Sequence, residues 1–290
     1  MTLAPASDPP VRQVSAIELE RRAFRKRQGT KSVVISVVST LVLAAVVWVT
    51  LISTPGWAAV QEMFFDWDVA VASFPRIWQG FLLNLQVLAI SAVLVVLFGL
   101  LIATLRTLRG PVWLPLRALA AAYTDLFRGL PLIIVLYLVG FGIPGLGLIP
   151  VRLPFAFWGV VALTLTYSAY VAEVFRAGIE AVHPSQRQAA RSLGLSHAKT
   201  MRLIVVPQAF RKVTPALMND FVALQKDVGL ISVLGAVDAV RAAQIETAKF
   251  FDFTPYVVAG ILFVLLAIPT IRLTDWYTAR DRRRRTQSAT

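Results

Sequence analysis

Residues Gly80–Leu105 have the sequence GFLLNLQVLAISAVLVVLFGLLIATL, and this stretch determines the kind of fold that the chain can adopt. It contains no charged side chain, and its few polar side chains are amides and hydroxyls. A helix that crosses the hydrocarbon core of a bilayer, about 30 Å thick, needs about 20 mostly apolar residues. The stretch therefore predicts a membrane-spanning α-helix.

The composition of the whole chain also indicates a membrane protein. Of its 290 residues 57% are hydrophobic and 16% are charged. A soluble domain carries roughly 45–50% apolar and about 25% charged residues. The chain has no cysteine and only two histidines, His183 and His197, which excludes disulfides, thiol nucleophiles and iron–sulfur clusters. We therefore expect no metal site and no cofactor.

Five other stretches are candidates for membrane spans. In chain order they are Ser32–Ser53, Leu119–Ile143, Pro154–Gly178, Val213–Val237 and Tyr256–Leu273. The second and third carry charged side chains toward one end. Val213–Val237 contains Lys226 and Asp227 near its middle, so its hydropathy alone does not establish it as a span.

The charges between these stretches predict the topology, because short cytoplasmic loops hold an excess of lysine and arginine. Basic residues dominate the tails 1–31 and 276–290, the loop that contains Arg106, Arg109 and Arg117, and the long loop before Val213. Residues 53–79 hold three acids and one arginine, which places them outside. Both termini are predicted to be cytoplasmic, which requires an even number of crossings. Val213–Val237 supplies the sixth span.

The net charge of +13 thus lies mostly on one membrane face, where it offsets anionic lipid headgroups, and it calls for no nucleic-acid partner. The first span, 32–53, follows a basic tail and lacks a small-residue cleavage pattern, so we expect an anchor rather than a cleaved signal peptide. Segment 54–79 contains Trp57 and Trp67 among acids. It is predicted to lie on the outer membrane interface.

The loop 180–210 is long enough to be functional and has the sequence pattern of helices. Ser185 and Gln188 fit a capping box, which predicts a helix start at Ser185. Gly194 tolerates the left-handed backbone conformation that ends helices, and Ser196 offers a second cap before a helix that continues to Pro207. The loop is therefore predicted to hold two short helices that meet at a bend near Gly194. From these signals alone it could be a solvated connector.

The spacing in this loop resembles a known family. Gln188-Ala189-Ala190, three residues, Gly194, nine residues and Ile204-Val205-Val206-Pro207 resemble the coupling loop of ATP-binding-cassette (ABC) importer permeases, Glu-Ala-Ala-x3-Gly-x9-Ile-x-Leu-Pro. Gln188 replaces Glu and Val206 replaces Leu. The resemblance implies an ATPase-coupling site formed by Gln188, Ala189, Ala190, Gly194, Ile204 and Pro207.

Two further stretches resemble the polar amino-acid branch of these permeases. They are AYTDLFRGLPL at residues 122–132 and AYVAEVFRAGI at residues 169–179. The resemblance extends over Gly80–Asp275. It implies an all-α, polytopic membrane protein with a five-span type I permease core at 80–275, to which span 32–53 is an addition.

The resemblance also implies partners and a location. Such a permease carries a polar amino acid across the bacterial cytoplasmic (inner) membrane as a multi-pass protein of the lipid bilayer. Two cytoplasmic ATP-binding subunits, a second permease subunit, identical or related, and an extracytoplasmic substrate-binding protein would complete the importer. The chain itself is not expected to be an enzyme, because Lys199-Thr200 lacks the preceding glycines of a Walker motif.

Charged and polar side chains within the predicted spans are candidates for the translocation path. Each charge near the middle of a span costs roughly 2.5–3.5 kcal/mol on insertion scales, so Lys226 and Asp227 should not face lipid. They either pair with each other or with a neighbouring helix, or they line the path. Glu173 could instead form an i,i+3 ion pair with Arg176 that stabilises the helix end. The candidates are Tyr170, Glu173, Asn219, Lys226 and Asp227.

Two other functional classes remain open on these residues. A proton- or sodium-driven amino-acid carrier would use Lys226, Asp227 and Glu173 as an ion relay, although the internal repeat that is typical of such carriers is not visible. A membrane-embedded enzyme would need clustered nucleophiles, and both histidines lie in the long loop. Dependence of uptake on ATP or on an ion gradient distinguishes these classes.

Overall fold

The computed structural model describes residues 16–108, 110–148 and 153–287, and within these ranges every regular element is helical. This agrees with the predicted all-α class. Parts of both predicted tails, residues 1–15 and 288–290, and Arg109 of the predicted inside loop lie outside the described residues. The chain divides into two compact units, one up to Gln61 and one from Glu62 onward.

The first unit consists mainly of α1 (Ala16–Ile52), a helix of 37 residues. Its apolar part, Lys31–Ile52, is long enough to cross a membrane and contains nearly all of the predicted span 32–53. The helix begins well before this apolar part. Half of the predicted N-terminal tail is therefore helical.

The second unit begins within α2 (Trp57–Phe64) and continues into α3 (Trp67–Thr107), a helix of 41 residues. Helix α3 contains the whole predicted span Gly80–Leu105, and it begins well before Gly80, at Trp67. Asp66 caps the helix by accepting a hydrogen bond from the amide of Val69 at 3.0 Å, and acids near a helix N-terminus are favourable. Arg76 pairs with Glu246 at 3.1 Å, which offsets its charge. The predicted interfacial segment 54–79 therefore contains the first turns of α3.

The predicted span Leu119–Ile143 is not one helix. It comprises α4 (Leu114–Gly129), α5 (Leu132–Tyr137), a π-helical turn at Leu138–Gly142 and α6 (Ile143–Gly145), with a bend of 110° after α4. The bend lies at Leu130, whose backbone is extended (φ −89°, ψ 135°). The residue before a proline avoids the helical conformation, and Pro131 follows directly.

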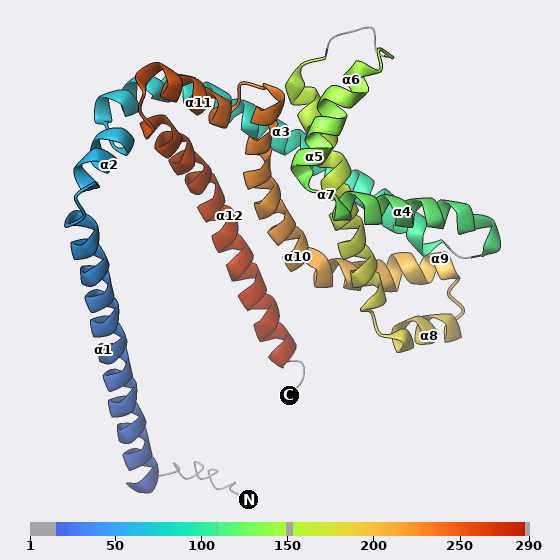
Figure 1. The fold of residues 1–290 in the computed structure, drawn as a ribbon. Helices are drawn as coiled ribbons and strands as arrows, with labels where there is room; N and C mark the ends of the chain where they lie inside the picture. Colours follow the sequence, from blue (N-terminus) through green and yellow to red (C-terminus); the bar gives the residue numbers. More distant parts are fainter. Residues whose placement is uncertain (1–15, 109, 149–152, 288–290) are drawn as a thin grey trace, which may run out of the picture. The chain divides into compact units, whose positions relative to one another are not determined.

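Helix α7 (Phe155–Glu180) forms the centre of the second unit and agrees with the predicted span Pro154–Gly178 to within two residues. It packs against α3, α4, α5 and α10 (Figure 1). Small residues allow this close contact. A Cβ atom on Gly99 of α3 would lie 2.6 Å from Val171 Cγ1, so a larger residue there would separate α3 from α7.

The remaining helices follow α7. They are α8 (Pro184–Ser192), α9 (His197–Thr200), α10 (Val206–Asp227), α11 (Ala239–Phe250) and α12 (Thr254–Gln287). Figure 1 shows α8 and α9 together near the end of α7, while α12 lies beside α10 and α11. A 3₁₀ segment, Val228–Leu234, extends α10, so the predicted span Val213–Val237 is helical through Leu234.

Four helical stretches of the described residues are long and apolar enough to cross a membrane: Lys31–Ile52, Trp57–Thr107, Phe155–Glu180 and Thr254–Asp281. The last contains the predicted span Tyr256–Leu273. Two bent pairs, α4 with α5–α6 and α9–α10 with α11, raise the number to six if each crosses as one span. The structure therefore gives four to six candidate spans.

Candidate coupling loop and charged residues of the spans

The predicted helix start at Ser185 is wrong. Helix α8 begins at Pro184, and the cap is His183, whose Nδ1 accepts a hydrogen bond from the amide of Ser185 at 3.3 Å. Proline is favoured at the first helical position because its ring fixes φ and no N–H is needed there. Ser185 is thus inside the helix, and its hydroxyl lies 2.7 Å from the same ring nitrogen.

The predicted bend at Gly194 is present. Gly194 has φ +79°, and the amide of Leu195 donates to the carbonyl of Ala190 at 3.1 Å, which is the hydrogen bond of a Schellman motif. Ser196 then caps α9, because its hydroxyl accepts a hydrogen bond from the amide of Lys199. The two predicted short helices and the glycine between them therefore form a tight corner.

The sequence predicted that the second short helix ends at Pro207, but the helix continues past this residue. A π-helical turn at Met201–Val205 joins α9 to α10, and the amide of Val206 donates to the carbonyl of Met201. Proline cannot donate, and its ring clashes with the carbonyl four residues earlier. Since the wider turn removes this clash, the loop passes into α10 as a nearly continuous helix. Movement of the loop would act directly on α10.

The loop has a buried side and an exposed side. Ala190 is 4% exposed, and Val205 packs with Val182 and Ala209 in a small apolar cluster. Ile204 is half-buried. The predicted coupling residues Gln188, Ala189, Gly194 and Pro207 are exposed, as are four apolar side chains: Leu193, Leu203, Val206 and Phe210.

Two cations, one on α8 of this loop and one on α10, bind the C-terminal end of α7. The guanidinium of Arg187 donates to the carbonyl of Ile179, and the ammonium of Lys212 donates to the carbonyl of Ala181, both at 2.5 Å. No acidic residue occurs from Ala181 to Asn219, so the exposed side of the loop is cationic as well as partly apolar. A surface with this chemistry suits a protein partner.

Glu173 lies in an ion cluster that joins three helices. Its Oε2 accepts a hydrogen bond from Arg106 Nη1 of α3 at 2.7 Å, and Arg128 Nη1 of α4 is 3.9 Å away. Its carboxylate also pairs with Arg176 on its own helix. The alternative i,i+3 pair is thus present, within a larger ion cluster. Sequence reasoning assigned Arg106 only to a loop.

The structure does not bring the five predicted path residues together. The hydroxyl of Tyr170 donates to the carbonyl of Arg128 at 3.3 Å, near Glu173. Asn219 and Lys226 are exposed and lie two turns apart on one face of α10. Asp227 turns to α7, where it accepts a hydrogen bond from the hydroxyl of Tyr167 at 2.7 Å.

Lys226 and Asp227 therefore do not form an ion pair with each other in the described structure. Adjacent residues of a helix point about 100° apart, which explains why. Asp227 instead has an interhelical partner. Tyr167, which carries that hydrogen bond, was not singled out by sequence reasoning, because the contact joins residues far apart in the chain.

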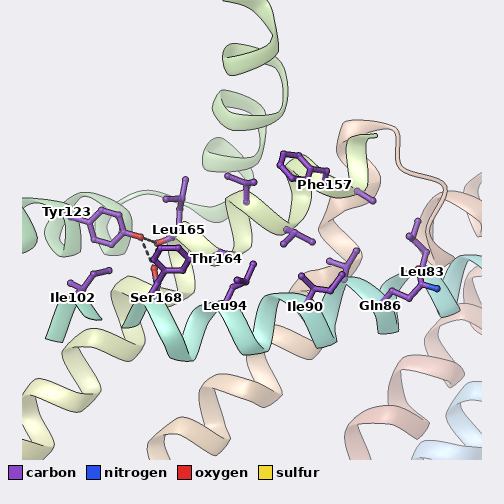
Figure 2. A pocket seen from close by; sticks show the side chains of 15 residues that line it. Leu83, Gln86, Ile90, Leu94, Ile102, Tyr123, Phe157, Thr164, Leu165 and Ser168 are labelled. Carbon is purple, nitrogen blue, oxygen red and sulfur yellow. Dashed lines mark hydrogen bonds between the residues drawn. The ribbon is translucent and has the colours of Figure 1, made fainter. Parts of the chain in front are cut away.

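A large cavity among the described residues contains none of these side chains. It has a volume of about 680 Å³ and lies between α3, α4 and α7 (Figure 2). Apolar side chains such as Ile90, Leu94 and Phe157 form most of its wall. The hydroxyl of Tyr123, at one end, already bonds to Leu165 O and lies 2.7 Å from Ser168 Oγ. Such a wall does not suit a charged amino acid.

The described residues contain no group of three or more histidine, aspartate or glutamate side chains that could hold a metal ion. The described residues thus form a helical membrane protein with an exposed, cationic loop that turns sharply at Gly194.

The chain belongs to the family of binding-protein-dependent transport system inner membrane components, whose model matches residues 114–283. It is an ABC importer permease, a multi-pass protein of the cytoplasmic membrane. This membership decides between the importer permease and the ion-driven carrier in favour of the permease.

Two curated relatives and one solved structure show how far the similarity extends. The arginine transport system permease protein ArtQ of Bacillus subtilis is 33% identical over 210 residues, 71% of this chain and 92% of the relative. The probable glutamine ABC transporter permease protein GlnP of Bacillus subtilis is 34% identical over 191 residues, 64% of this chain and 85% of the relative. A crystal structure of an amino acid ABC transporter with histidines is 33% identical, with a TM-score of 0.68, and covers 75% of this chain and 100% of that chain.

Proposed function

We propose that this permease carries a polar amino acid into the cell and that ATP-binding subunits drive it through the loop Gln188–Pro207. The observation that carries this proposal is the exposed corner at Gly194, where Gln188 and Ala189 face outward and the helix continues into α10. The relatives named for arginine and glutamine support an amino-acid substrate. Two ATP-binding subunits and an extracytoplasmic binding protein would complete the complex.

The face of α10 with Asn219 and Lys226 supports a second permease subunit and a path beside it. Both side chains are exposed in the single chain. A lysine in a span faces protein or a water-filled cavity, because contact with hydrocarbon is costly. This face is therefore proposed to meet another permease subunit, identical or related, and to line the path with Asp227. Tyr170 and Glu173, at the cytoplasmic end of α7, would form the inner part of the path.

We propose the following arrangement in the membrane. Residues 1–31 and 276–290 are cytoplasmic, 32–53 is an extra span, 54–79 is external, and 80–275 is the five-span core. The match to the solved amino-acid transporter chain covers all of that chain but only 75% of this one. The remaining quarter of this chain is long enough to contain an added span. Each bent helix pair would then cross once, giving six spans.

Fusions of a topology reporter after residue 10 and after Thr290 test this arrangement. We expect both reporters to be cytoplasmic, because both tails are basic. A third fusion in segment 54–79 serves as the control and should be external. One internal and one external terminus would contradict the six-span arrangement.

Replacing Lys226 with methionine tests the proposed path. We expect Lys226→Met to insert as well as the parent and to lower uptake about tenfold or more, since a hydrogen bond to a charged group is worth about 1.5–3 kcal/mol. Uptake and membrane abundance are measured together. The matched control is Phe221→Leu, on another side of α10, which should retain uptake. Parental uptake and amino-acid preference in Lys226→Met would remove Lys226 from the path.

The importer assignment itself predicts a stable complex. Purified permease from its native host should retain nucleotide-binding ATPase subunits in detergent. Their absence at every ionic strength tested, with the permease still folded, would contradict docking through Gln188–Pro207.

A further inference from the structure

Asn84 is a fully buried amide on α3 that bonds to the junction between α10 and α11. Its Nδ2 donates to the carbonyl of Val228 at 3.1 Å and to Asp238 Oδ2 at 2.9 Å. Its Oδ1 accepts a hydrogen bond from the amide of Ala239 at 3.0 Å. One side chain thus connects three positions far away in sequence.

The two neighbouring backbones also touch at this place. Gly80 lies one turn before Asn84 on the same side of α3, and a Cβ atom there would lie 2.4 Å from the carbonyl carbon of Asp238. Asp238 is itself completely buried and caps α11, because its Oδ1 accepts a hydrogen bond from the amide of Arg241 at 2.9 Å. Neither a side-chain movement nor water can replace these contacts easily.

The junction directly follows the proposed path residues. Asp227 is the last residue of α10, Val228 begins the 3₁₀ segment, and the chain bends by 54° before α11. A 3₁₀ segment has poorer hydrogen-bond geometry than an α-helix, and such stretches often mark hinges. The amide of Asn84 instead binds both sides of this bend. Leaving buried polar groups without hydrogen-bond partners costs considerable free energy, so the bend is held in place.

We infer that Asn84 is a positioning residue that fixes Lys226, Asp227 and the start of α11 to α3, so that these parts move as one rigid body during transport. The inference rests on the proposed function, because it gives the path residues a fixed platform. Rearrangement between outward- and inward-facing states would then take place at other joints, such as the π-helical turn Met201–Val205.

Four variants of the complex with its ATP-binding subunits test this inference. They are Asn84→Ala, Asn84→Asp, the double exchange Asn84→Asp with Asp238→Asn, and the control Ser91→Ala. Ser91 is buried on the same helix, and its hydroxyl has no hydrogen-bond partner among the described residues. The apparent Tm and the number of ATP molecules hydrolysed per transported amino acid are measured for each.

We expect Asn84→Ala to lower the apparent Tm by about 5–10 °C, since it removes three hydrogen bonds to buried polar groups, whereas Ser91→Ala should not change it. Asn84→Asp should lower Tm further, because it places two carboxylates side by side. The double exchange should recover at least half of this loss, because the exchanged pair can restore every contact except the one to Val228 O. A double exchange no better than Asn84→Asp would overturn the contact.

The positioning role makes a separate prediction below the unfolding temperature. The complex with Asn84→Ala should hydrolyse at least about five times as much ATP per transported molecule as the parent complex. Displaced path residues would weaken the coupling between ATP hydrolysis and transport. A lower Tm with a parental ratio would show that Asn84 is only structural and would overturn the inference. Failure of the proposed function would appear differently, as a parent complex without ATP-driven uptake, while the Tm of the double exchange still reports on the contacts of Asn84.

Discussion

Substitution of Gly194 with valine should abolish ATP-driven uptake while leaving the chain inserted in the membrane. Gly194 has φ +79°, a conformation that β-branched residues adopt only with strain of about 1–3 kcal/mol. Apart from the adjoining residues, no atom of the described part of the chain lies within 4 Å of the position of a Cβ, so the effect comes from the backbone and not from a clash. The corner between α8 and α9 should open and displace the exposed Gln188 and Ala189. Uptake, membrane abundance and retained ATPase are the quantities to measure.

Gly194→Asn is the matched control, because asparagine tolerates the left-handed conformation. This variant should keep most of the parental uptake. Equal uptake in the parent, the valine variant and the asparagine variant would show that the loop is a solvated connector rather than a coupling element.

Substitution of Gly178 with alanine should destabilise the contact between α7 and α10. The added Cβ would lie 2.1 Å from Val213 Cγ1 and 3.3 Å from the carbonyl oxygen of Ala209. Overpacking of this kind costs about 1–3 kcal/mol, which corresponds to a fall in Tm of roughly 2–12 °C. Ala209 belongs to the apolar cluster under the loop, so uptake should fall as well.

A second substitution separates this clash from other effects of alanine. Gly178→Ala combined with Val213→Ala removes the obstructing methyl group and should regain much of the lost Tm. Gly260→Ala in α12 is the control and should be neutral or slightly stabilising, because a Cβ there would meet no described atom within 4 Å outside its own helical turn. If the double variant is no more stable than Gly178→Ala, the contact with Val213 is not the cause.

Local signals in the sequence predicted the bend and the second cap of the loop 180–210. Gly194 supplied the positive φ and Ser196 the cap, and both effects depend only on nearby residues. The error at Ser185 was avoidable, because Pro184 at the first helical position was a visible signal. Pro131 likewise indicated the break between α4 and α5, although a hydropathy window averages over such a residue.

Contacts between distant residues were not predictable from one sequence. The hydrogen bond from Tyr167 to Asp227 and the ion pair between Arg106 and Glu173 depend on how α7 packs against α10 and α3. That the side chains of Lys226 and Asp227 point in different directions could have been predicted, since neighbours on a helix do not face each other. The surroundings of Lys226 and of Asp227 could be determined only from the folded structure.

Uptake by reconstituted vesicles tests the central claim most directly. The permease, its ATP-binding subunits and its binding protein are placed in liposomes, and uptake of labelled arginine and glutamine is measured with ATP or with an imposed proton or sodium gradient. The proposed importer requires ATP on the side of Gln188–Pro207 and needs no ion gradient. Uptake driven by a gradient without ATP would contradict it, as would a lack of ATP-driven uptake, with all partners present, when the labelled set is extended from arginine and glutamine to every polar amino acid.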